Sequence, residues 1–125
     1  MARVVAFIPD LLFGSRVQAA LTASGHEVVL AADGGGVRRG LAGTAVLVVD
    51  LTDQELRGVG LIESLSADGL LHGVRTLGFY SHVDVEARAS AERAGFDLVV
   101  PRSRMAREGA ALVSRLAGGA SDEAV

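Results

Sequence analysis

Five short runs of apolar residues, rich in valine and continuous rather than alternating, constrain the fold of this chain most strongly. They occupy residues 3–8, 27–31, 45–50, 75–80 and 97–100. Continuous β-branched runs are typical of strands that are buried on both faces, as in parallel sheets. The fourth run is the least typical, because Gly78 weakens a strand. The sequence therefore predicts five strands inside a parallel sheet.

Segments with helical spacing separate these strands. The first predicted helix ends at Gly25, in the position of a left-handed C-terminal cap. The glycine-rich stretch 33–43 predicts only a short helix. The face of the first helix that is predicted to be buried consists of Leu12, Val17, Ala20 and Leu21.

Cap signals mark the starts of the three remaining helices. Thr52 and Glu55 form a predicted capping box, and Ser81 with Asp84 forms a looser cap. Ser103 is predicted to cap the last helix, which ends at the glycine pair 118–119. The chain therefore alternates strand and helix five times.

This alternation predicts right-handed crossovers and an α/β three-layer sandwich. The leading topology is a five-stranded parallel sheet of order 2-1-3-4-5, which is flavodoxin-like. The length of 125 residues fits one domain. We expect that domain to span residues 1–118, followed by a flexible C-terminal tail over residues 119–125.

Composition excludes several functional classes. The absence of cysteine excludes disulfides and thiolate zinc sites, and the absence of lysine excludes a Walker lysine. A net charge of −3 predicts no nucleic-acid or membrane partner. Neither a signal peptide nor an apolar run of membrane-spanning length is visible, so we expect a cytoplasmic protein.

The candidate site residues follow the predicted strands, because ligands of open α/β sheets bind at the carboxyl ends of the strands. Asp10 and Asp50 flank the predicted switch point, where two carboxylates offer the oxygen ligands that Mg²⁺ prefers. Alternatively, Asp10 caps the first helix and Asp50 caps the turn into the next one. The other candidates are Tyr80, Ser81 and His82 after the fourth strand and Arg102 after the fifth.

Histidine spacing indicates no metal site. His26, His72 and His82 are far apart in the sequence and lack the spacing of metal ligands. We expect His26 and His72 on the surface. For His82 a place at the start of a helix is favoured over a catalytic role.

Three segments resemble the receiver domain of two-component response regulators. AVLVVDLTD, residues 45–53, resembles the third receiver strand and implies that Asp50 has the phosphoacceptor position. FIPDLL, residues 7–12, resembles the first strand with the start of its acidic pocket, and ARASAERAGFDLVVP, residues 87–101, resembles the fourth helix and fifth strand. The resemblance extends from Arg3 to about Leu116 and implies the receiver fold and bacterial two-component signalling.

Departures from the receiver pattern affect its chemistry. Receivers carry two acids after the first strand, where this chain has Pro9 and Asp10. They carry lysine before the proline of the fifth strand, where this chain has Val100, with Arg102 two residues on. Phosphoryl transfer depends on charge neutralisation by metal and cation, so these losses predict an atypical or pseudo-receiver with impaired or absent phosphorylation.

The resemblance and its departures lead to three hypotheses. The first is a stand-alone receiver-like signalling or protein-interaction module without enzyme activity or cofactor, which binds a protein partner or itself, as a homodimer. The second is a working phosphoacceptor with Asp50 as nucleophile, Asp10 on Mg²⁺ and Arg102 in place of lysine. The third is a small-molecule-binding domain that uses Asp10, Asp50, His82 and Arg102.

Pairing in the first hypothesis is expected through the fourth helix, fifth strand and fifth helix, because receivers commonly pair there. Mixed charge on that surface suits specificity and register. The charged residues expected on it are Glu86, Arg88, Glu92, Arg93, Arg104, Arg107, Glu108 and Arg115.

Overall fold

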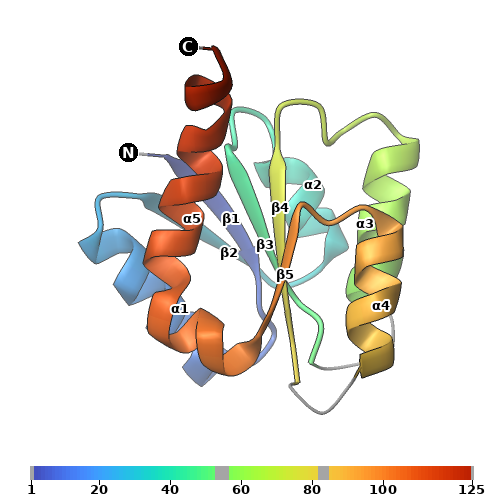
Figure 1. Cartoon of the computed structure of the whole chain (residues 1–125), viewed down its shortest axis with the longest axis horizontal. Coiled ribbons are helices and arrows are strands. Elements are labelled where there is room, and N and C mark those ends of the chain that lie inside the picture. The colour runs from blue at the N-terminus through green and yellow to red at the C-terminus, as the bar shows by residue number, and fades with distance from the viewer. Residues whose placement is uncertain (1, 53–56, 82–84, 125) are drawn as a thin grey trace.

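The computed structural model describes residues 2–52, 57–81 and 85–124. Strands and helices alternate along it (Figure 1). The strands are β1 (Arg3–Phe7), β2 (Glu27–Ala31), β3 (Val46–Asp50), β4 (Arg75–Tyr80) and β5 (Leu98–Pro101). The helices are α1 (Leu11–Ala23), α2 (Gly34–Gly40), α3 (Arg57–Ala67), α4 (Val85–Ala94) and α5 (Arg102–Ala124).

The five strands form one sheet of order β2-β1-β3-β4-β5, in which every neighbouring pair is parallel. The predicted topology is confirmed. In the centre of the sheet, Phe7 of β1 pairs with Ala31 on one side and Val49 on the other. The strand predictions are wrong only at their ends: β1 and β3 are shorter by one residue and β5 is shifted by one.

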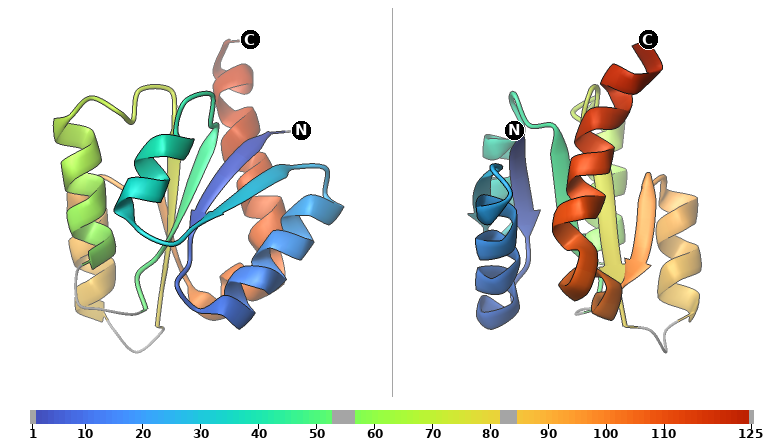
Figure 2. Two further views of the ribbon diagram at one scale, coloured as in Figure 1. Left: turned by 180° about the vertical axis from the view of Figure 1, so that it is seen from behind. Right: turned by 60° about the vertical axis from the view of Figure 1, so that its left-hand side comes forward.

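Both faces of the sheet are covered by helices, which explains the continuous apolar runs. In β1, Val4 and Ala6 pack in a core cluster with α1 and α5, whereas Val5 and Phe7 pack with α2, α3 and α4. Figure 1 shows α5 in front of the sheet, and the reverse view in Figure 2 shows α2 on the opposite side. All five residues of β3 are buried.

The buried face of α1 differs from the prediction. Leu12 is 80 % exposed, and Ala20 is exposed as well. Phe13 is buried instead, together with Val17 and Leu21. The side chain of Asp10 caps the helix, so α1 begins at the next residue, and positions four residues apart then share one face. The predicted buried face of α1 starts at Leu12, one residue before the observed one.

Several helix ends match the expected caps. Ser24 closes α1, and Gly25 follows with a φ of 92°. The helix in the glycine-rich stretch is short, and Asp33 caps it by accepting a hydrogen bond from the Gly36 amide. Apart from Thr52, the predicted capping box lies outside the described residues, as does Asp84 of the looser cap.

The two ends of α5 were predicted wrongly. Arg102 is already helical, because β5 runs directly into α5, so Ser103 lies within the first turn and not at the cap. The backbone of α5 continues to Ala124, beyond Gly118, which does not adopt the left-handed conformation that ends a helix. A flexible tail over residues 119–125 stays a prediction.

His26 is buried, at 7 % exposure, so the expectation of a surface position is wrong. Its Nδ1 accepts a hydrogen bond from the Ala2 amide at 3.1 Å, and its Nε2 lies 2.9 Å from the Ser114 hydroxyl. Burial lowers the pKa of His26, because it penalises the charged imidazolium. The Ser114 hydroxyl that bonds to this ring belongs to α5, and spacing within the sequence does not reveal such a contact.

Among the described residues, none of the helices combines the length and the apolar character needed to cross a membrane.

Gly58 allows α3 to pack directly on β3. A Cβ atom at this position would come within 2.6 Å of Leu51 Cδ2 and 2.8 Å of Val49 Cγ1. Gly60, in the same turn of the helix, has open space where a Cβ would stand. The two glycines therefore form a matched pair in which only one has a packing function.

We expect Gly58→Ala to lower the free energy of unfolding by about 1–3 kcal/mol through overpacking. Gly60→Ala should raise it by about 0.5–1 kcal/mol, because alanine favours the helix. Urea unfolding of both variants measures the two effects. Equal effects in the two variants would contradict the close approach at Gly58.

Candidate functional site

The carboxyl ends of the strands meet at one edge of the sheet, at the bottom of Figure 1. A surface depression lies at this edge, and loops or helix starts that follow β1, β3, β4 and β5 contribute to it. It is lined by Phe13, Thr52, Ser81, Arg102, Ser103 and Ala106. Asp10 and Asp50 adjoin it through hydrogen bonds to two of these residues, Arg102 and Thr52.

Asp10 has a hydrogen-bond donor at each carboxylate oxygen. Its Oδ1 accepts from the Phe13 amide at 3.1 Å, which caps α1, and its Oδ2 lies 3.3 Å from Nη2 of Arg102. The bond from the Phe13 amide, followed by that from Arg102, lowers the pKa of Asp10. The capping alternative considered for Asp10 is the one found, with an arginine partner added.

Arg102 is held on two sides at the start of α5. Besides its contact with Asp10, its guanidinium carbon lies 4.1 Å from the centroid of the Phe13 ring. Such a position over an aromatic face attracts a cation. The Phe13 ring in turn packs against Phe79 of β4, at 5.2 Å between centroids.

Sequence reasoning missed Phe13 as part of this site. The signal that could have found it is the spacing of Phe13, Val17 and Leu21, which recur every four residues. Its contact with Arg102 crosses from α1 to the last helix, and only the tertiary structure brings the two together.

Asp50 lies at the end of β3 and is 4 % exposed. Its Oδ1 accepts hydrogen bonds from the Thr52 amide at 2.7 Å and from the Thr52 hydroxyl at 2.6 Å. An aspartate that bonds to the backbone two residues on forms an Asx-turn, which shapes the exit from the strand. The turn-capping alternative for Asp50 therefore has a geometric basis.

At the end of β4 the structure places two of the candidate residues in different surroundings. Tyr80 is buried, at 6 % exposure, in the core cluster that includes α3 and α4. Ser81 lines the depression together with Thr52 and Arg102. His82, the third candidate, lies outside the described residues.

As arranged here, the Asp10 carboxylate is not free to bind a magnesium ion. Mg²⁺ requires oxygen ligands in near-octahedral geometry, with their lone pairs directed at the metal. Both oxygens of Asp10 face hydrogen-bond donors, one of them the positive guanidinium of Arg102. In the part of the chain that the structure describes, no three His, Cys, Asp or Glu side chains group as metal ligands.

Comparison of the sequence with family models and with curated proteins finds no match. Comparison with solved structures finds many matches. A CheY-like receiver domain protein from Methanospirillum hungatei has a TM-score of 0.81 at 18 % identity, over 98 % of each chain. The receiver domain of the putative response regulator NarL from Mycobacterium tuberculosis has a TM-score of 0.79 at 23 % identity, over 94 % of this chain and 97 % of that one. The chain has the fold of a response-regulator receiver domain.

A third similar structure is the receiver domain of a Pseudomonas aeruginosa sensor histidine kinase, with a TM-score of 0.79 at 17 % identity. It covers 94 % of this chain and 98 % of that one, and it holds a magnesium ion in its active-site cleft. At these identities the likeness concerns the receiver fold. The resemblance predicted from residues 7–12, 45–53 and 87–101 is confirmed at that level.

The bonds that Asp10 accepts from the Phe13 amide and from Arg102 should make stability depend on pH. Asp10→Asn keeps an acceptor for the Phe13 amide but removes the charge that faces Arg102. We expect a lower denaturation midpoint for this variant at neutral pH. Because the pKa of Asp10 is lowered by folding, the unfolded chain takes up protons first as the pH falls.

The difference between the wild type and Asp10→Asn should therefore be complete above the ordinary pKa of 3.8 and disappear as the pH falls through the lower, folded value. Urea midpoints across an acid pH series measure it. Asp33→Asn is the control, because Asp33 caps α2 but has no ion pair within the described ranges. A difference that persists unchanged in strong acid would contradict the ion pair.

Proposed function

We propose that this protein is a receiver-fold signalling module that acts through protein contacts, is not itself an enzyme, and is phosphorylated poorly or not at all. The observation that carries this proposal is the ion pair of Arg102 with Asp10. In the receiver pattern, the loop after the first strand supplies acids for a cation. Here its acidic residue is committed to an arginine and to the cap of α1.

The chemistry of phosphoryl transfer supports the proposal. Catalysis of this reaction consists almost entirely of positioning and charge stabilisation, with metal ions neutralising the developing charge. Pro9 stands where receivers have their other acid, and Val100 stands where they have lysine. Loss of one preorganised electrostatic group typically costs about 3 kcal/mol of transition-state stabilisation. With both groups replaced, we expect Asp50 to react slowly.

A second candidate function, that of a working phosphoacceptor, is favoured by one observation. Asp50 lies at the end of β3, beside a depression to which Ser81 and Arg102 contribute. Arg102 would then leave Asp10 and supply the positive charge that lysine supplies in receivers. A guanidinium differs from an ammonium in geometry, so the replacement is not conservative.

Incubation with acetyl phosphate and Mg²⁺, followed by intact-mass measurement, separates the two functions. We expect no phosphoryl adduct under conditions in which a receiver domain with both acids and the lysine is largely modified. Asp50→Asn is the matched control. A high-occupancy adduct that disappears in this variant would contradict our proposal and establish the phosphoacceptor.

We further propose that the module pairs with a second copy through the surface of α4, β5 and α5. Charges of both signs lie there in exposed pairs, such as Arg88 with Glu92 at 3.5 Å and Arg104 with Glu108 at 3.5 Å. Exposed pairs within one helix contribute little to stability, so their charges are available to select a partner. Val85, at the start of α4, adds an exposed apolar side chain.

We expect light scattering to show a dimer whose dissociation constant rises about tenfold in Arg88→Glu, because a charge reversal places like charges across the interface. Arg39→Glu is the control, since Arg39 is exposed on α2, which packs on β1 and β2 and not on β5 as α4 does. A wild-type protein that stays monomeric at high concentration, or equal effects of the two variants, would contradict self-association through α4.

A further inference from the structure

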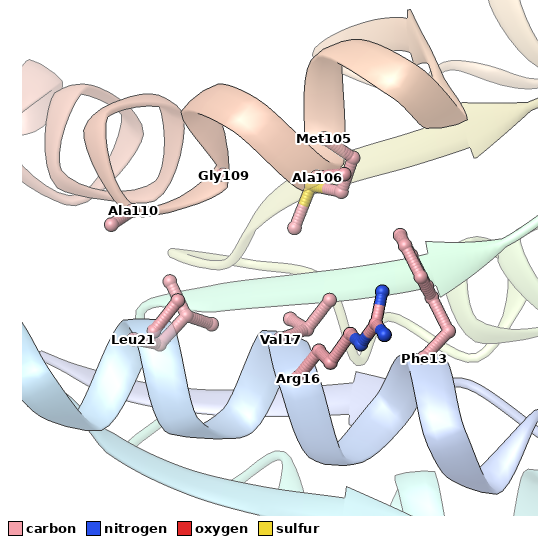
Figure 3. Close-up of a pocket in the computed structure, with 9 residues that line it drawn as sticks. Phe13, Arg16, Val17, Leu21, Met105, Ala106, Gly109 and Ala110 are labelled. Carbon is pink, nitrogen blue, oxygen red and sulfur yellow. The ribbon is translucent and has the colours of Figure 1, made fainter.

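A cavity of about 120 Å³ lies between α1 and α5, outside the depression at the sheet edge. It opens to solvent along the groove between the two helices. Its walls are apolar and consist of Phe13, Val17 and Leu21 on α1 and of Met105, Gly109 and Ala110 on α5 (Figure 3).

The cavity exists because the two helices present side chains of unequal size to each other. The α1 side chains that form its inner wall already belong to the core, so they cannot move outward to fill the gap. On α5, Gly109 and Ala110 are too small to fill it. A cavity of about 150 Å³ lined by apolar side chains is large enough to take up benzene, so the space between α1 and α5 approaches the size of a single ring.

Arg16 adds a positive charge to this apolar space. It is exposed on α1, and Figure 3 shows its side chain extending into the gap beside Phe13. Within the described part of the chain, no acidic side chain forms an ion pair with it. Guanidinium groups bind carboxylates through two parallel hydrogen bonds, so an arginine beside an apolar cavity selects an anionic head on an apolar body.

We propose that this cavity binds a small carboxylate whose apolar part has the size of a single six-membered ring. The ring lies between α1 and α5, against the edge of Phe13 and the sulfur of Met105, two contacts that favour an aromatic ligand. The carboxylate lies at the mouth, on the guanidinium of Arg16.

Phe13 connects the cavity to the sheet edge. Its ring forms part of the cavity wall, and the guanidinium of Arg102 lies over the same ring. A ligand in the cavity therefore touches Phe13, which contacts both Asp10 and Arg102.

Benzoate is the probe, with benzamide as its neutral isostere and acetate as an anion without the ring. We expect millimolar benzoate to raise the melting temperature and to shift the NMR signal of the Met105 methyl group. Benzamide should bind about tenfold more weakly, because it lacks the charge-assisted hydrogen bonds. Acetate should produce neither effect.

Two pairs of variants locate the site. Ala110→Leu fills the cavity and should abolish the response to benzoate, whereas Ala111→Leu, at an exposed position next to it, should not. Arg16→Met should reduce the affinity for benzoate to that for benzamide, whereas Arg115→Met, an exposed arginine on α5, should leave it unchanged. Melting temperatures without ligand show that each variant is folded.

The proposal is overturned if benzoate changes neither the melting temperature nor the Met105 signal of the wild type. It is also overturned if Ala110→Leu binds benzoate as well as Ala111→Leu does, or if benzamide binds as tightly as benzoate. Shifts of the Met105 signal that follow protein concentration and not benzoate would mean that a second copy of the chain covers the groove, which overturns it as well.

Discussion

Burial of both faces of the sheet is the constraint on which the rest of this structure depends. One layer of helices buries Val4 and Ala6, and another buries Val5 and Phe7. Each connection between parallel strands therefore crosses a face of the sheet. Parallel strands with such crossovers bring all their carboxyl ends to one edge. The arrangement of the candidate site therefore follows from how the apolar residues are covered.

At that edge, Phe13 is the residue that connects the most features. It supplies the amide that Asp10 caps, the ring on which Arg102 lies, and part of the wall of the α1–α5 cavity. Its ring is also anchored against Phe79 in the core. Through these contacts Phe13 connects α1 with the start of α5 and with β4.

How much could be predicted from the sequence differs between the fold and the site. Valine-rich runs and the cap at Gly25 lead to the correct strands and helices, and the strand order follows from the flavodoxin-like topology that five such units favour. The approach of Arg102 to Asp10 joins residues 92 positions apart, and no local pattern reports such a contact. The hydrogen bond between His26 and Ser114 of α5 was missed for the same reason.

The sequence by itself determined the parallel α/β sheet, its order, and the positions of Asp10, Asp50 and Arg102 at one edge of it, because these follow from periodicity and from the rules of strand connection. Only the tertiary structure decided which partners these side chains take, that Ser81 and not Tyr80 lines the depression, and that a cavity remains between α1 and α5. Side-chain partners and cavities depend on the packing of segments distant in the chain, whereas the strands and their crossovers are indicated by local spacing and by general rules of strand connection.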